Sequence, residues 1–327
     1  MRVFISIIML LIILLISLFY YNRIPKINMM ETEEKCNFMS SRGIMRSCNI
    51  YSNKPMIKSS IKKLIGYDFT KGFEGCSIYI CTSAIPVFVN EIDKIKYRFI
   101  LVTGDADESC PVDLFTNDTF NSFIENYKII HWYAQNCVIK HKKMTQLPIG
   151  LDYHTMSNNN HHKWGNYQTP MKQEIVLSGI SNNSLPFWER KLKCYSNFHF
   201  NINSYDRGDA INSIDKNLVD YETHQIKRDE TWNKMTSYCF IISPHGNGLD
   251  CHRTWEALHL GCIPIVKKSS LDNMYDNLPV LIVNEWSDIN INLLNSTINK
   301  FRNIKDNFDY DKLRLEHWVS KIKYNIL

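Results

Sequence analysis

The apolar residues of this chain form one long run at the amino terminus and a series of short runs further along. Residues 3–20 are eighteen residues without a charge, a glycine or a proline. A helix of that length spans about 27 Å, close to the thickness of the hydrocarbon core of a bilayer. The run predicts a single uncleaved membrane anchor in contact with lipid, because it is not followed by the small-residue cleavage site of a signal peptide, which is the alternative interpretation.

Beyond residue 55, short apolar runs alternate with longer amphipathic ones, which is the pattern of parallel βαβ units covered by helices. The pattern predicts strands over residues 77–81, 97–103, 128–132, 174–178, 238–243, 263–267 and 280–284. It predicts helices over residues 114–127, 186–197, 221–236, 250–260, 289–304 and 310–326.

A polar stretch over residues 153–172 divides the expected strands into two groups. The predicted fold class is therefore α/β, with two Rossmann-type parallel-sheet domains that face a cleft. The expected divisions are a cytoplasmic tip and transmembrane anchor (1–26), a stem (27–55), a first domain (56–160) and a second domain (161–327).

Composition removes several classes of function. The chain has 44% hydrophobic residues, and its 38 Lys and Arg against 33 Asp and Glu give a net charge of only +5. Without a basic cluster, this balance predicts no nucleic-acid partner. The ten cysteines contain no CxxC pair, so no zinc site is expected, and the glycine signatures of P-loop and dinucleotide enzymes are missing.

The most informative segment is a strand, a glycine-containing turn and a helix over residues 239–266. Gly246 and Gly248 leave room for a phosphate to approach the backbone, and the start of the following helix favours an anion. On that helix Arg253 is placed to bind a diphosphate and Glu256 to accept hydrogen bonds from a ribose. The alternative is an ordinary βα turn followed by an exposed Arg–Glu pair.

The string SPHGNGLDCHRTWEALHLGCIPIV (243–266), continued by residues 271–286, resembles the carboxy-terminal domain of exostosin-like glycosyltransferases. The resemblance implies a GT-B fold, in which the second domain binds a nucleotide sugar and the first binds a glycan or glycoprotein acceptor. It also implies type II topology with the body facing the Golgi or endoplasmic reticulum lumen. Carried over by position, Arg253 contacts the donor diphosphate, Glu256 the donor ribose or sugar, and the loop beneath the phosphates consists of His245, Gly246, Asn247 and Gly248. The further donor-binding candidates are Ser243, Asp250 and Lys267.

The base that deprotonates the acceptor stays open between two pairs of residues. Asp105 and Asp107 follow an apolar strand, and Asp152 and His154 follow the run LPIG. A strand running into Asp-x-Asp is also how metal-dependent GT-A transferases hold Mn²⁺, so a metal site is the alternative for the first pair.

The expected function is membrane-anchored, inverting transfer of a sugar from a nucleotide-diphosphate donor to a hydroxyl. Arg253 and the glycine turn would neutralise the departing diphosphate, so neither a metal nor another cofactor is required. The alternatives are the Mn²⁺-dependent GT-A transferase and a membrane protein that binds glycans without turnover.

Overall fold

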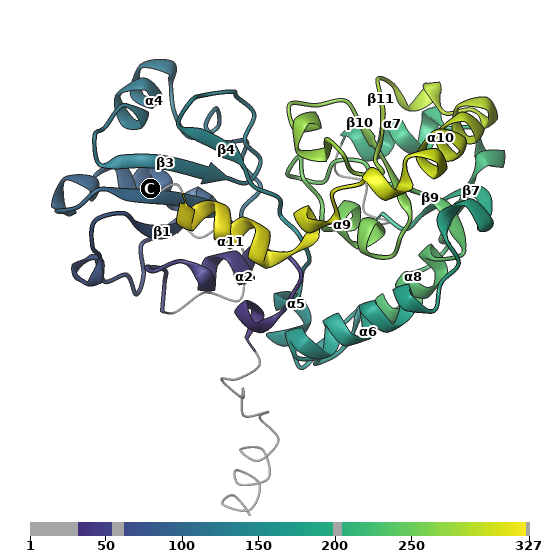
Figure 1. Cartoon of the computed structure of the whole chain (residues 1–327), viewed down its shortest axis with the longest axis horizontal. Helices are drawn as coiled ribbons and strands as arrows, with labels where there is room; N and C mark the ends of the chain where they lie inside the picture. The colour runs from purple at the N-terminus through teal and green to yellow at the C-terminus, as the bar shows by residue number, and fades with distance from the viewer. Residues whose placement is uncertain (1–31, 54–61, 199–204, 325–327) are drawn as a thin grey trace, which may run out of the picture.

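The computed structural model describes residues 32–53, 62–198 and 205–324, which form two lobes, each built on a parallel sheet (Figure 1). The expected anchor at residues 3–20 lies outside the described residues. Within those residues, no helix combines the length and the apolar character that crossing a bilayer requires.

The first sheet has the strand order β1-β2-β3-β4, and its neighbouring strands are all parallel. Its strands are β1 (Cys76–Cys81), β2 (Phe99–Gly104), β3 (Ile129–Ala134) and β4 (Met144–Gln146). Every residue of β1 and β2 is buried, as expected of strands that are covered on both faces. The short helices α3 (Ile85–Val89) and α4 (Asn117–Ile124) belong to this lobe.

The second sheet has the order β11-β10-β9-β7-β8 and is also parallel. Its strands are β7 (Lys191–Ser196), β8 (Val219–Tyr221), β9 (Tyr238–Ile242), β10 (Ile263–Lys267) and β11 (Leu281–Val283). The helices of this lobe are α7 (Tyr205–Ser213), α8 (Arg228–Met235), α9 (His252–His259) and α10 (Ile291–Asn303). Two parallel α/β sheets are thus confirmed.

The segment that joins the lobes is more ordered than its polar composition suggests. It contains α5 (His154–Ser157), a hairpin of β5 (His161–His162) and β6 (Gly165–Asn166), and α6 (Pro170–Asn182). The strand expected at residues 174–178 is wrong, because these residues lie inside α6. Thr169 caps that helix through its side chain and Pro170 opens it, a helix-start signal that outweighs the short apolar run.

The helix expected at residues 186–197 is also wrong, because this stretch holds a single 3₁₀ turn followed by β7. Its apolar residues alternate along β7, and the strand pairs with both β8 and β9. Pairing on both sides places it inside the sheet, where tertiary contacts override local helix preference.

Both ends of the described chain pack against the first lobe. The helix α2 (Ser41–Ser47) lies in the part expected to be a stem, yet Met39 and Ile44 are fully buried in a cluster with Val102 of β2. The described part of that segment, residues 32–53, is therefore not an extended stem but part of the fold.

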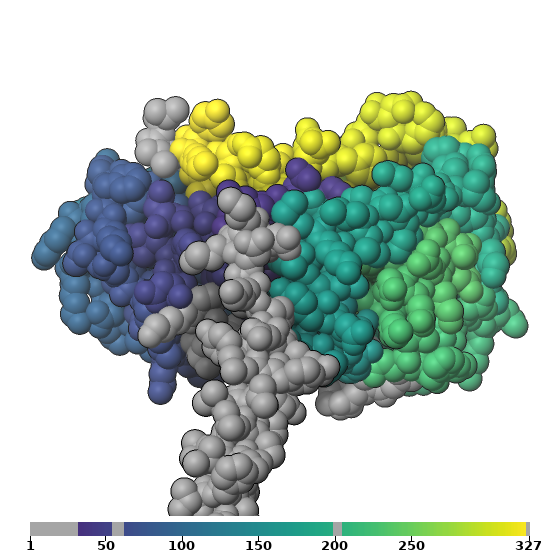
Figure 2. Space-filling model, turned by 90° about the horizontal axis from the view of Figure 1, so that it is seen from below, coloured from purple at the N-terminus to yellow at the C-terminus, as the bar shows by residue number. Residues whose placement is uncertain are grey.

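The last helix, α11 (Leu315–Tyr324), returns from the second lobe and contributes Leu315 and Trp318 to the same cluster. It contacts α2 beneath the first sheet (Figure 1). Seen from below, the carboxy-terminal segment runs along both lobes (Figure 2). The expected second domain, 161–327, thus ends in a helix that packs on the first lobe.

Candidate functional site

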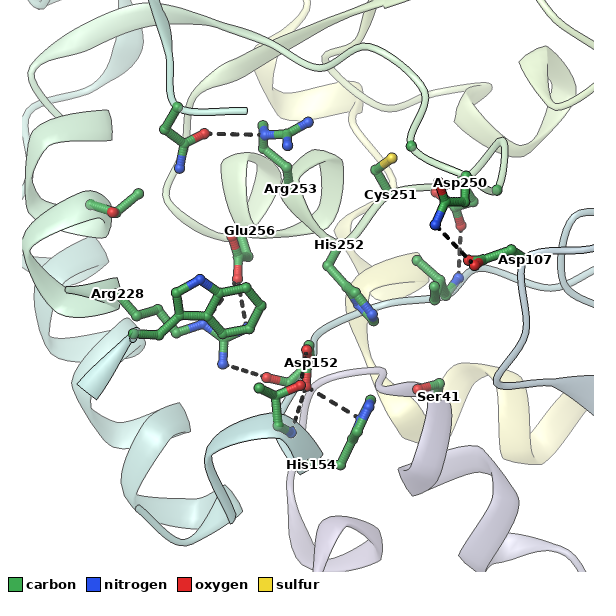
Figure 3. A pocket seen from close by; sticks show the side chains of 18 of the residues that line it. Ser41, Asp107, Asp152, His154, Arg228, Asp250, Cys251, His252, Arg253 and Glu256 are labelled. Atoms are coloured by element: carbon green, nitrogen blue, oxygen red, sulfur yellow. Dashed lines mark hydrogen bonds and ion pairs between the residues drawn. The ribbon is translucent and has the colours of Figure 1, made fainter. Parts of the chain in front are cut away.

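A cavity of about 480 Å³ lies between the lobes, where loops at the carboxyl ends of the strands meet. The first lobe contributes residues 105–107 after β2. The second contributes Asn197 after β7, Glu222 after β8 and residues 246–248 after β9. Ligands of parallel α/β sheets bind at these strand ends, so the cavity is the candidate site. Figure 3 shows its lining, to which α5, α8 and the start of α9 also contribute.

The glycine turn docks directly onto the first lobe. A Cβ built on Gly248 would lie 2.9 Å from Asn136 Nδ2 and 3.2 Å from the backbone oxygen of Asp107. Only glycine allows this approach. Asn247 Nδ2 lies 3.5 Å from Asp107 Oδ2, so the turn forms a contact between the lobes at the rim of the cavity.

Asp250 connects the lobes in the same region. Its backbone N–H donates to Asn136 Oδ1 at 2.9 Å, and its carboxylate accepts from the backbone N–H of Ile149 at 2.7 Å. Trp255 Nε1 donates to the same carboxylate at 2.9 Å. Burial raises the pKa of Asp250 to about 6, although these donors act in the opposite direction. Asp250 lines the cavity, and its hydrogen bonds serve mainly to connect the lobes.

Arg253 places a partly buried positive charge in the cavity wall. Its Nε donates to Asn197 Oδ1 at 3.1 Å, and its guanidinium lies 5.7 Å from the centre of the Phe198 ring. Another nitrogen of the guanidinium group, Nη1, is buried and has no hydrogen-bond partner among the described residues. Burial lowers the pKa of Arg253, and Arg207 nearby acts in the same direction. A buried donor without a partner is costly, and an anion in the cavity would satisfy it.

Glu256 is held by an arginine that the sequence did not single out. Arg228 Nη2 donates to Glu256 Oε1 at 3.0 Å, and both side chains are about nine-tenths buried. Arg228 also donates to Gln173 Oε1 at 3.0 Å, and its guanidinium lies 4.9 Å from the centre of the Trp164 ring. The pair orients Glu256 in the cavity wall, because a buried carboxylate needs such a partner.

Asp152, His154 and His252 lie together on the other side of the cavity (Figure 3). Thr155 donates to both oxygens of Asp152, and His154 Nδ1 lies 3.3 Å from Asp152 Oδ1. Burial acts to raise the pKa of Asp152, but His154, His252 and Arg228 hold it well below its ordinary value. Burial lowers the pKa of His154. His252 Nδ1 lies 2.7 Å from the carbonyl oxygen of Gly150.

The two residues of the Asp-x-Asp sequence have different surroundings. Asp105 is buried and its carboxylate lies 3.4 Å from Arg42 Nη2, whereas Asp107 is exposed and faces Asn247. Within residues 32–53, 62–198 and 205–324, no group of three or more His, Cys, Asp or Glu side chains is arranged to hold a metal. The negative charge of Asp105 is thus balanced by the positive charge of Arg42.

Three of the residues expected to bind the donor, Ser243, His245 and Lys267, do not line the cavity. Ser243 is buried, and its hydroxyl lies 2.8 Å from Thr254 Oγ1. The backbone N–H of His245 donates to Asp206 at 2.8 Å. Both contacts hold the loop after β9 in place, so these residues support the site from outside the cavity.

Lys267 has a similar supporting role at the end of β10. Its Nζ lies 3.0 Å from a carboxylate oxygen of Asp209 and 2.6 Å from one of Glu285. Because both carboxylates belong to the second lobe, the lysine joins neighbouring segments of that lobe and its charge is already paired.

The cavity does contain the other residues expected at the site: Asp105, Asp107, Asp152, His154, Gly246, Asn247, Gly248, Asp250, Arg253 and Glu256. Sequence reasoning missed Arg228, His252 and Ser41, which also line it. His252 adjoins Arg253 in the most informative segment, so its position was a usable signal. Arg228 and Ser41 come from distant parts of the chain, and only the tertiary fold brings them here.

Comparison with known proteins gives little beyond this geometry. No family model matches the chain, and no curated protein matches it. Among solved structures, one described as trehalose-6-phosphate from E. coli bound with UDP-2-fluoro glucose is 9% identical, with a TM-score of 0.40 and coverage of 77% of this chain and 74% of that one. The apo structure of OtsA is 8% identical, with a TM-score of 0.34 and coverage of 79% and 71%. At these scores the likeness carries no argument.

Proposed function

We propose that the chain is a GT-B-type glycosyltransferase that transfers a sugar from a nucleotide-diphosphate donor to a hydroxyl of a glycan or glycoprotein. The observation that carries the proposal is Arg253, which lines the cavity between two parallel-sheet lobes and whose buried Nη1 has no hydrogen-bond partner among the described residues. A diphosphate supplies the negative charge and the acceptor oxygens that this group lacks.

The remaining contacts of the cavity fit the parts of such a donor. The backbone of residues 246–248 lines the same cavity as Arg253. Because Gly248 packs against Asn136 and Asp107, the part near Gly246 is left for a phosphate. Glu256 is held through Oε1 by Arg228, and its other oxygen is assigned to the ribose hydroxyls. Arg253 would stabilise the negative charge that develops on the departing diphosphate, which is the largest electrostatic demand of the reaction.

The membrane anchor, the lumenal location and the metal independence remain predictions. The resemblance of residues 243–266 to exostosin-like transferases supports the first two, and the pairing of Asp105 with Arg42 supports the third. Chelation with EDTA is therefore expected to leave transfer unchanged. Loss of activity with recovery on adding Mn²⁺ would instead favour the metal-dependent alternative.

The test is a panel of nucleotide sugars incubated with the full chain, with release of UDP or GDP as the measurement. We expect one donor to be hydrolysed slowly, and Arg253→Met to abolish that hydrolysis. Arg302→Met is the matched control, because Arg302 is an exposed arginine on α10 of the same lobe. Nucleotide binding without hydrolysis or transfer would favour a glycan-binding protein, and no binding at all would refute the proposal.

A further inference from the structure

The orientation of His252 bears on the base that the proposed reaction needs. Its Nδ1 lies 2.7 Å from the carbonyl oxygen of Gly150, and a carbonyl oxygen only accepts hydrogen bonds. In the neutral ring the proton therefore sits on Nδ1, which leaves a lone pair on Nε2. This is the form in which an imidazole can take a proton.

The carbonyl that fixes this tautomer is itself held firmly. Gly150 has a positive φ of 64°, and a Cβ there would lie 2.2 Å from the backbone oxygen of Met39. The next residue, Leu151, donates its N–H to that same oxygen at 2.8 Å. The first lobe thus sets the direction of the Gly150 carbonyl, and through it the ring of His252.

His252 and Arg253 point to different parts of the cavity. Neighbouring residues on a helix diverge, and Figure 3 shows the His252 ring directed toward the side of His154 and Ser41 while Arg253 points away. Ser41 is almost fully buried, and its Oγ has no hydrogen-bond partner among the described residues. His154 Nδ1, on the same side of the cavity, also has no hydrogen-bond partner in the described part of the chain, so unpartnered polar groups gather on the His252 side, apart from Arg253.

The other base candidates are less suited. Both oxygens of Asp152 accept hydrogen bonds from Thr155, and its low pKa makes it a weak base. Asp105 is paired with Arg42, and Asp107 is exposed at the rim. His154 is about nine-tenths buried beside Asp152. His252 is only partly buried, so its ring is open to the cavity.

We infer that His252 Nε2 is the base that deprotonates the acceptor hydroxyl, and this inference rests on the proposed function. The hydroxyl proton moves to Nε2 while the oxygen forms a bond to the anomeric carbon. The bond from that carbon to the phosphate oxygen breaks, and its electron pair leaves with the nucleoside diphosphate. The imidazolium then releases the proton to water. Asp152, His154 and Asp250 are the titratable groups whose charges interact with His252.

The test compares His252→Asn with His154→Asn in the full chain. An asparagine amide can replace Nδ1 as donor to Gly150, so His252→Asn keeps the structural hydrogen bond and removes only the base. We expect the variant to bind UDP or GDP within about threefold of the unmodified chain while donor hydrolysis falls by about 10²- to 10⁴-fold. The acidic limb of the pH profile should disappear, and added imidazole should restore part of the rate.

Two results would overturn the assignment. Hydrolysis by His252→Asn within threefold of the unmodified chain would exclude His252, as would a large loss confined to His154→Asn. If the unmodified chain binds no nucleotide, the proposed function itself fails. That outcome is recognised before any variant is measured.

Discussion

Replacing Arg253 by methionine separates binding from stability. The guanidinium donates one hydrogen bond to Asn197, lies against Phe198, and leaves Nη1 buried without a described partner. Losing the first two contacts costs about 2 kcal/mol, and removing the orphaned donor recovers about 1–3 kcal/mol. The free energy of unfolding without ligand is therefore expected to stay within about 1 kcal/mol of its original value.

Nucleotide affinity should respond very differently. Hydrogen bonds to a charged group contribute about 1.5–3 kcal/mol, which corresponds to an increase of about 10- to 150-fold in the Kd for UDP or GDP. Urea unfolding measures the first quantity and isothermal titration calorimetry the second. A Kd within threefold of the original, or a loss of stability above about 3 kcal/mol, would refute the reasoning, because the guanidinium would then serve the fold and not a ligand.

Three further predictions concern stability. Gly248→Ala forces a Cβ against Asn136 and the Asp107 backbone and should cost about 1–3 kcal/mol in urea unfolding. Gly246→Ala should cost less, because its tightest contact is with the Arg207 side chain at 3.1 Å. Burial raises the pKa of Glu33 to about 7 from 4.5, which means that the folded chain favours the protonated carboxyl group. The free energy of unfolding therefore falls as the pH rises from 4.5 through about 7. Glu33→Gln should remove up to about 3 kcal/mol of this pH dependence, and an unchanged slope between pH 5 and 8 would contradict the assignment. Trp318→Ala leaves a cavity between α11 and the first lobe and should lower the free energy of unfolding by about 3–5 kcal/mol. An unchanged free energy of unfolding would show that α11 does not stabilise that lobe.

The sequence predicted the elements whose signals are local and strong. Runs such as residues 77–81 and 263–267 are apolar and β-branched, and they form β1 and β10 within one residue of the expected bounds. The errors came from weaker signals, and they include the start of the helix expected at residues 221–236, which begins at Arg228 after β8 ends at Tyr221. The stretch 174–178 looked like a strand because its helix cap, Thr169, lies outside the apolar run, and β7 looked like a helix because only its neighbours in the sheet decide its conformation.

The site residues that lie in one short segment could be predicted from the sequence. Those that come together only in the folded chain could not. Arg253, Glu256 and the glycine turn lie within eleven residues and all contribute to the cavity. Arg228 is 28 residues from Glu256, and Ser41 comes from a segment expected to be a stem. No spacing rule connects such residues, because their proximity depends on how the two lobes pack.

The return of α11 to the first lobe means that the polypeptide crosses between the two halves twice, once near residue 150 and again before residue 315. Two chain connections allow one lobe to rotate about the line that joins them, but they restrict sliding and twisting of the lobes against each other. Any hinge movement of the lobes would therefore be limited to rotation about that line, and it would have to break the hydrogen bond from the Asp250 backbone to Asn136.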